Sequence, residues 1–130
     1  MDEQKHIINE LGLDKYETKS YGIYFEKKIN GSVLNGSFDG KKEEILPLLP
    51  HIKKVFGDFS QFDKKAHTLI QNKSPDEDAS ELVAGDIIFY SNGDFSIGYD
   101  AGDSPAGELY LYVKFDSDFT MYAELIYECY

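Results

Sequence analysis

The hydrophobic positions near the start of the chain repeat with a helical period. Ile7, Ile8 and Leu11 fall on one face of a helix that the pattern predicts over residues 2–11. Gly12 follows, and glycine is common just after the last turn of a helix because it readily adopts the left-handed conformation. The chain is therefore expected to open with a short helix that has one apolar face.

An extended pattern replaces the helical one in the next segment. Runs rich in β-branched and aromatic residues predict strands over 20–29 and 32–39. The pair Asn30-Gly31 stands between them, and both residues tolerate the positive φ angles of a type I′ turn. This segment therefore predicts a β-hairpin.

Two helices are predicted in the middle of the chain. The first has apolar residues at the i, i+4, i+7 and i+11 positions of one face, namely Ile45, Leu49, Ile52 and Phe56. An interior proline removes a backbone hydrogen bond, so the regular part of this helix is expected to run from Pro47 to Gly57. The second helix is predicted over 60–72, and its buried face consists of Phe62, Ala66, Leu69 and Ile70.

The second half of the chain has the pattern of short strands separated by turn residues. Its extended runs are "ELVAGDIIFY", "GDFSIGYD", "GELYLYVKF" and "TMYAELIYECY". In the third run apolar residues alternate with polar or aromatic ones, which is typical of a sheet with one buried face. In the acidic stretch 94–108, a strand is expected over 95–99, and "DAGDSPAG" is expected to turn the chain into a strand over 107–115.

These elements predict an α+β fold. The expected architecture is an N-terminal helix and β-hairpin, two helices, and then a four-stranded antiparallel meander, with the helices packed on one side of the sheet. At 130 residues, with 42% hydrophobic and 15% aromatic residues, residues 1–130 are expected to form a single domain.

The composition and the N-terminal residues indicate where in the cell the protein is expected to be. No apolar run approaches the roughly 18–20 residues that a membrane span needs. The start "MDEQKHIINE" lacks the features of a secretory signal, so a cytoplasmic location without membrane attachment is expected. Cys129 is the single cysteine, which excludes an intramolecular disulfide and a cysteine cluster for zinc.

The net charge of −11 is concentrated in one half of the chain. Residues 74–130 contain 13 acids and one base, Lys114, whereas the preceding residues are nearly neutral, and the chain has no arginine. Such an acidic half repels phosphate backbones, so nucleic-acid binding is not expected. It suits a protein partner with a basic surface, or it serves only to keep the protein in solution.

No motif predicts an enzyme or a cofactor. Nucleotide-binding glycine loops, a G-x-S-x-G elbow and HExxH are all absent from the sequence. The three histidines, His6, His51 and His67, fall in predicted helices without a nucleophile and an acid at meaningful spacing. We therefore expect no catalytic activity and no cofactor.

The acidic stretch offers one alternative to a protein-binding function. Asp94, Asp100, Asp103 and Glu108 could supply the oxygen ligands of a calcium-binding module. The spacing of an EF-hand loop is absent, because Ala101 stands where a second ligand would be needed. Calcium binding is therefore the second hypothesis rather than the first. A hydrolase is the third, since paired carboxylates for glycoside hydrolysis need a defined separation and a cleft that the sequence does not show.

Tyrosines in the last strands suggest a protein-binding surface. If they lie on the face away from the apolar residues, aromatic and acidic side chains share one surface of 86–127, which suits a partner rich in lysine and arginine. If a helix covers that face, the tyrosines are structural. The predicted binding residues are Asp94, Tyr99, Asp100, Asp103, Glu108, Tyr110, Tyr112, Tyr122 and Glu124.

The segment "FSIGYDAGDSPAGELYLYV" resembles an uncharacterised family of small bacterial α+β domains with a YD-x-GD turn. The matching positions are Tyr99, Asp100, Gly102, Asp103, Gly107 and Val113. Family members often have an aromatic pair and a histidine after "GD", where this chain has "SPAGE". Some members look like immunity proteins of bacterial toxin systems, so the resemblance implies a small acidic protein that blocks a toxin.

Overall fold

The computed structural model describes residues 3–20, 22–75, 81–105 and 107–130, except the side chains of residues 103 and 104. Its elements, in chain order, are α1 (Glu3–Leu11), β1 (Lys15–Lys19), β2 (Gly22–Ile29), β3 (Ser32–Asp39), α2 (Lys42–Ile45), the 3₁₀ turn η1 (Leu46–Leu48), α3 (Leu49–Gly57), α4 (Phe59–Lys73), β4 (Ala84–Tyr90), β5 (Phe95–Ser104), β6 (Gly107–Phe115) and β7 (Met121–Cys129).

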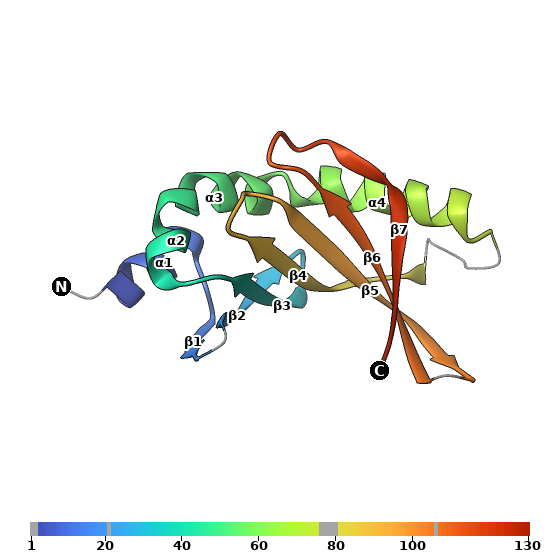
Figure 1. Cartoon of the computed structure of the whole chain (residues 1–130), viewed down its shortest axis with the longest axis horizontal. Helices are drawn as coiled ribbons and strands as arrows, with labels where there is room; N and C mark the ends of the chain where they lie inside the picture. Colours follow the sequence, from blue (N-terminus) through green and yellow to red (C-terminus); the bar gives the residue numbers. More distant parts are fainter. Residues whose placement is uncertain (1–2, 21, 76–80, 106) are drawn as a thin grey trace.

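The described strands form one seven-stranded sheet, in which they lie side by side in sequence order (Figure 1). All neighbours are antiparallel except β3 and β4, which are parallel. A parallel pair needs a long crossover, and the helical segment from α2 to α4 provides it. The hairpin of β2 and β3 turns at Asn30 (φ 53°) and Gly31 (φ 82°), as the Asn-Gly pair predicts.

The predicted architecture is wrong in how it divides the strands. It separates an N-terminal hairpin from a four-stranded antiparallel meander, whereas the structure joins them in one mixed sheet. The pairing of β4 with β3 extends the sheet and covers an edge that a separate hairpin would leave unpaired. The strand β1 is also missing from the prediction, because "KYETK" has almost no apolar residues to mark it.

Pro47 and Pro50 lie where the helical crossover between β3 and β4 changes from α2 to the η1 turn and then to α3. Pro47 lies in the η1 turn, and Pro50 occupies the first turn of α3, where its missing N–H is not needed. The regular helix therefore begins at Leu49, two positions after the predicted start, and ends at Gly57 as expected. None of the helices within the described ranges has the length and apolar character that crossing a membrane requires.

Helices and strands share one core on one face of the sheet. Buried side chains of α1, α3 and α4 join those of β2 to β6 in a single cluster. Phe62 of α4 lies at its centre, with ring centroids 5.2 Å from Phe95, 5.3 Å from Phe115 and 5.8 Å from Phe119. In Figure 1, β6 and β7 pass in front of α4, which lies behind the sheet.

The acidic stretch 94–108 is mostly strand rather than turn. β5 continues to Ser104, which pairs with Gly107 of β6. A bulge between Asp100 and Gly102 interrupts the ladder, and Gly102 has φ 91°, a conformation that favours glycine. The result is a long hairpin that extends beyond the neighbouring strands (Figure 1).

Candidate functional site

The sheet has an open face, because the described helices pack on its other side. Along β6, Leu111, Val113 and Phe115 are buried in the core, and the residues between them point away from it. The strand register carries this alternation onto the neighbouring strands. We define the open face by the charged and large side chains on this side of β4 to β7, together with the adjoining Asp94 and Tyr130: Asp86, Ile88, Tyr90, Asp94, Asp100, Glu108, Tyr110, Tyr112, Lys114, Tyr122, Glu124, Ile126, Glu128 and Tyr130.

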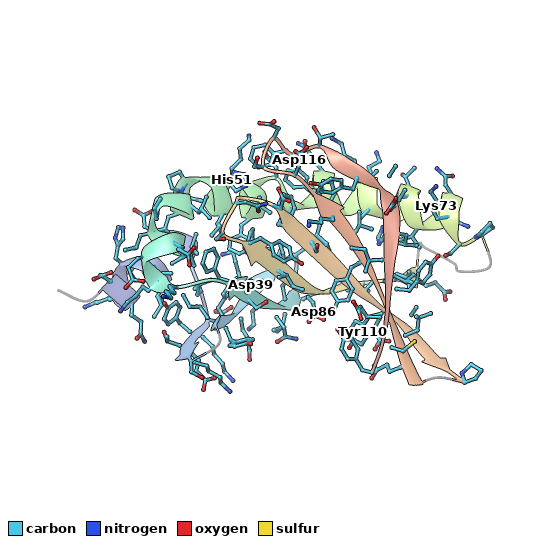
Figure 2. All side chains as sticks on the ribbon, in the orientation of Figure 1. Asp39, His51, Lys73, Asp86, Tyr110 and Asp116 are labelled. Atoms are coloured by element: carbon cyan, nitrogen blue, oxygen red, sulfur yellow. The ribbon has the colours of Figure 1, made fainter. Side chains whose placement is uncertain are left out.

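Three tyrosines form a cluster at one end of the open face. The rings of Tyr110 and Tyr112 are stacked, with centroids 6.3 Å apart and planes inclined by 23°. The ring of Tyr130 meets Tyr110 edge-on at 5.3 Å, and its hydroxyl lies 3.3 Å from that of Tyr112. Such contacts restrict the rings, so the cluster presents a preformed aromatic surface. Figure 2 shows Tyr110 close to the point where β5, β6 and β7 cross.

Tyr112 lies across the neighbouring strand because a glycine is beneath its ring. A Cβ atom on Gly98 would lie 2.6 Å from Cε1 of Tyr112 and 3.1 Å from Cβ of Asp86. Tyr112 is therefore nearly buried, with only 7% of the residue exposed. Its hydroxyl lies 3.5 Å from Oδ2 of Asp86, to which it donates a long hydrogen bond.

Asp86 is a half-buried acid on β4, the central strand of the sheet, where the open face begins (Figure 2). Burial raises its pKa above the usual 3.8, the hydrogen bond from Tyr112 partly offsets this increase, and the nearby charge of Asp100 raises the pKa further. A carboxyl group with a raised pKa destabilises the folded state when it is ionised. The open face thus includes an acid that is unfavourable for stability at neutral pH.

We expect Asp86→Asn to be more stable than the parent protein at neutral pH. In the parent, the folded carboxyl binds its proton more tightly than the unfolded one. The contribution of Asp86 to stability is therefore full below pH 3.8 and is lost as the pH rises through the raised folded pKa. Thermal unfolding of both proteins between about pH 3 and about pH 8 should show a Tm difference that grows with pH. A difference that is the same at every pH would contradict this prediction.

The single lysine of the open face is held by an acid and two aromatic rings. Lys114 Nζ lies 3.7 Å from Oδ2 of Asp94, 4.9 Å from the ring centroid of Tyr90 and 5.5 Å from that of Tyr122. The hydroxyl of Tyr122 donates to the same Asp94 oxygen at 3.3 Å. Because Asp94 balances this cation locally, the remaining carboxylates give the open face its negative charge.

Large side chains are exposed where the open face meets the edge of β7. Tyr122 is 43% exposed and Ile126 is 39% exposed. A shallow depression of about 430 Å³ lies here, and its lining consists of Lys114, Tyr122, Ala123, Glu124 and Ile126. An apolar floor beside a carboxylate can receive a side chain that has an aliphatic stem and a positive end.

The structure places the predicted binding residues in two groups on the open face. One group lies with the tyrosine cluster and consists of Asp100, Tyr110 and Tyr112. The other lies toward the opposite end of β5 to β7 and consists of Asp94, Tyr122 and Glu124. Glu108 is half-buried at the start of β6, where its backbone pairs with Tyr130. The side chain of Asp103 lies outside the described residues, and its backbone pairs with Glu108.

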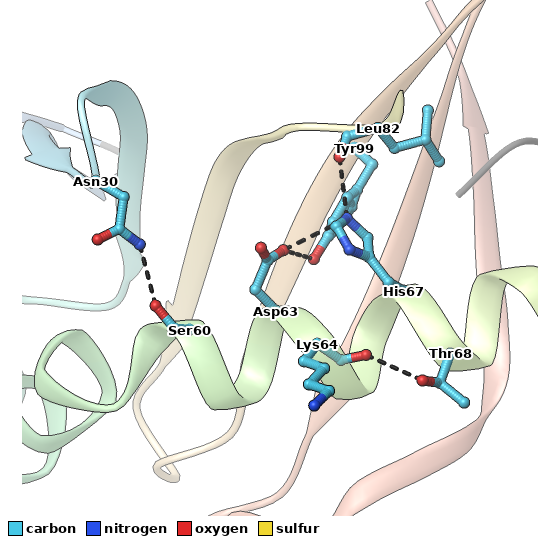
Figure 3. A network of polar contacts seen from close by, with 8 residues as sticks. All are labelled: Asn30, Ser60, Asp63, Lys64, His67, Thr68, Leu82 and Tyr99. Atoms are coloured by element: carbon cyan, nitrogen blue, oxygen red, sulfur yellow. Dashed lines mark hydrogen bonds and ion pairs between the residues drawn. The ribbon is translucent and has the colours of Figure 1, made fainter. Parts of the chain in front are cut away.

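Tyr99 does not belong to the binding surface, which corrects the prediction. It is 0% exposed and lies on the core side of β5, because it alternates with Gly98 and Asp100 in the strand. Its hydroxyl donates a short hydrogen bond of 2.5 Å to Oδ1 of Asp63 on α4 (Figure 3). Burial and the charge of Asp63 both raise the pKa of Tyr99.

Asp63 also faces His67, and together with Tyr99 and Leu82 they form a polar network that connects elements of the fold. Nε2 of His67 lies 3.0 Å from the carbonyl oxygen of Leu82 and 3.7 Å from Oδ1 of Asp63 (Figure 3). A carbonyl oxygen only accepts, so His67 donates from Nε2 to Leu82. The network thus ties α4 to β5 and to the segment before β4, and buried Tyr99 presents no reactive group to a substrate.

The acids of the stretch 94–108 do not converge in the part of the chain that is described. Asp94 precedes β5 and Asp100 lies six residues further along, so they are about 20 Å apart in an extended strand. Asp100 Oδ1 accepts a hydrogen bond from the backbone N–H of Gly102 at 2.8 Å. Among the described side chains, no group of three or more His, Cys, Asp or Glu could hold a metal ion. Calcium binding stays a prediction without a described site.

The predicted binding set leaves out residues that help to form the surface. Ile126 alternates with Glu124 and Glu128 in the sequence, so the period of two places it on the same face. Tyr130 follows the last strand and joins the cluster through its contact with Tyr110, which no local pattern indicates.

No family model, curated protein or solved structure matches this chain. The resemblance of the segment around Tyr99 and Asp100 to the YD-x-GD family therefore stays a prediction. What the geometry defines is an α+β sheet protein in which the β4–β7 part of the uncovered side is acidic and rich in tyrosine.

Proposed function

We propose that this chain is a non-enzymatic binding protein that engages a basic protein partner through the open face. The observation that carries the proposal is the composition of this face. It combines six carboxylates and five tyrosines with a single lysine, and Asp94 lies beside that lysine.

Electrostatics favours a basic partner. Residues 74–130 contain 13 acids, and Lys114 is their only base. Opposite charges on two proteins raise the rate at which they meet and orient them before they touch. A negative face of this kind would attract a surface rich in lysine and arginine from a distance of about one Debye length, roughly 8 Å at physiological salt.

The tyrosines supply the short-range part of the interaction. Tyrosine is enriched among interface residues that contribute most to affinity, because it buries a large ring and keeps a polar end. Contacts with the nearly buried Tyr112 hold Tyr110 and Tyr130 in place, so little side-chain entropy is lost when a partner covers these two rings. Tyr122 adds an exposed ring near the edge of the sheet.

The positions of the histidines support a binding role over a catalytic one. His6, His51 and His67 all lie on helices, and so none of them belongs to the open face. His51 and His67 each face a backbone carbonyl oxygen, that of Gly93 at 2.7 Å and that of Leu82 at 3.0 Å. The proposed mechanism is therefore occlusion, in which the open face covers a functional surface of the partner, as an immunity protein covers a toxin.

The first test is binding to the protein encoded by the gene next to this one, measured at several salt concentrations. We expect the association rate to fall about tenfold between low salt and roughly 0.5 M NaCl, because salt screens the attraction between the two surfaces. The dissociation rate should change much less, since it reflects contacts that are already formed. Stopped-flow or surface-plasmon measurements give both rates. Absence of binding, or an association rate that salt does not change, would count against the proposal.

A further inference from the structure

The outer edge of β7 has backbone groups that no described strand pairs with. Glu108 and Tyr130 exchange both of their backbone hydrogen bonds, at 3.0 and 2.9 Å, which fixes the pattern of the β6–β7 ladder. Hydrogen-bonded pairs alternate in an antiparallel ladder, so Ile126 and Glu128 also direct their N–H and C=O groups toward β6. Leu125, Tyr127 and Cys129 direct theirs outward, and β7 is the last strand of the described sheet.

The two edges of the sheet differ in how open they are to another strand. At the opposite edge, β1 is only five residues long, and Lys15 and Lys19 both lie on it in ion pairs with neighbouring glutamates. Short edges that carry lysine resist pairing with other chains. β7 has nine residues, no lysine, and an exposed Ile126 in the middle. It is therefore the edge at which another strand can add.

The charges on β7 disfavour a second copy of this chain as the added strand. If two β7 strands paired antiparallel about Ile126, Glu124 of one copy would stand opposite Glu128 of the other, and the reverse pair would repeat the repulsion. Each copy also carries a net charge of −11. A strand with lysine or arginine at the same positions would instead form two opposite-charge pairs.

We propose that β7 binds an extended segment of the partner by strand addition, and that this segment has the pattern basic–x–apolar–x–basic. Adjacent positions on one face of a strand are two residues apart, so basic residues would face Glu124 and Glu128 while an apolar residue faces Ile126. The stem of one basic side chain would lie in the depression lined by Tyr122 and Ile126. This inference rests on the proposed function and specifies how the partner binds.

The proposal is tested by NMR titration of the ¹⁵N-labelled protein with the capped peptide Thr-Lys-Thr-Val-Thr-Lys-Thr. A peptide with the same composition but adjacent lysines, Thr-Thr-Lys-Lys-Val-Thr-Thr, is the control. We expect the first peptide to slow hydrogen exchange of the outward amides of Leu125, Tyr127 and Cys129. The control should bind at least about tenfold more weakly, which corresponds to roughly 1.4 kcal/mol.

Two variants at one position separate strand addition from attraction by charge. Tyr127→Pro removes an outward N–H, and proline is tolerated on edge strands, whereas Tyr127→Thr removes the same side chain and keeps the N–H. We expect the peptide to bind Tyr127→Thr as it binds the parent, and to bind Tyr127→Pro at least about tenfold more weakly. If Tyr127→Pro does not fold, the exchange of the parent's outward amides decides the question.

Three results would overturn the inference: no binding of the alternating peptide, equal binding of both peptides, or binding without slower exchange at Leu125, Tyr127 and Cys129. None of them bears on whether the open face binds the neighbouring gene product. A partner that binds with strong salt dependence, together with unprotected β7 amides, would retain the proposed function and exclude strand addition.

Discussion

Replacing Gly36 with alanine is expected to lower the free energy of unfolding by about 3 kcal/mol. Gly36 lies on the core side of β3, directly opposite Phe25 in the register of β2 and β3. A Cβ atom at this position would lie 2.0 Å from Cε2 and 2.3 Å from Cζ of Phe25. Real Cβ atoms do not approach other atoms so closely, so the ring would have to move.

The Phe25 ring has little room to move. It is 4% exposed and packs edge-on against Phe56, with centroids 6.2 Å apart. It also stacks on Phe89, with centroids 6.3 Å apart and planes inclined by 25°. Displacing it would disturb both contacts in a close-packed core, in which overpacking typically costs about 1–3 kcal/mol and occasionally more. This is why the expected effect of one added methyl group is so large.

Gly85→Ala provides a matched control on the neighbouring strand. A Cβ atom on Gly85 of β4 would have no atom within 4 Å, and Gly85 does not have a positive φ angle. The change should therefore be neutral or stabilise the protein by up to about 0.5–1 kcal/mol, because alanine reduces the freedom of the unfolded chain. Urea unfolding of both variants measures the difference. Equal stabilities of the two variants would show that Phe25 does not cover Gly36.

The second large effect is expected from reversing the charge of the β7 edge. Glu124→Lys combined with Glu128→Lys should weaken binding of the basic partner about 100-fold, because two attractive contacts become repulsive, at a total of roughly 2.8 kcal/mol. Most of the change should appear in the association rate. Both glutamates are exposed, so the unfolding free energy should stay within about 0.5 kcal/mol of the parent's.

A second double variant separates the local effect from the change in net charge. Glu3→Lys combined with Glu43→Lys changes two exposed acids on α1 and α2 and raises the net charge from −11 to −7, as the β7 variant does. It should leave the affinity within about threefold of the parent's, since these helices lie away from the open face. Comparable losses in both variants would indicate that the partner responds to total charge and not to this surface.

Local patterns predict much of this fold because they report interactions between residues close in sequence. The Asn30-Gly31 pair predicts its hairpin, since both residues accept the left-handed conformation that the turn requires. The apolar period of 60–72 predicts a helix that the structure places at Phe59–Lys73. β1 escapes prediction because its partner β2, rather than its own composition, holds it in the sheet.

Local sequence patterns predict the candidate binding surface less well than they predict the helices and strands. The alternation of Tyr110 and Tyr112 with Leu111 separates two faces, but a period of two does not indicate which face a helix covers. Tyr99 is a different case, because its position in step with Phe95 and Ile97 already assigns it to the apolar side, where it is fully buried. The neighbouring acids, which suggest a surface role, misled the prediction.

The sequence by itself determined most of the helices and strands, the two faces of the last strands and the concentration of negative charge from residue 74 on. Only the tertiary structure decided that β3 and β4 pair in parallel, that no described helix covers the tyrosine-bearing face and that β7 is the long outer edge of the described sheet. The physical reason is the range of the interactions. Propensity, periodicity and turn chemistry act over a few residues, whereas strand partners and coverage by helices depend on contacts between segments far apart in the chain.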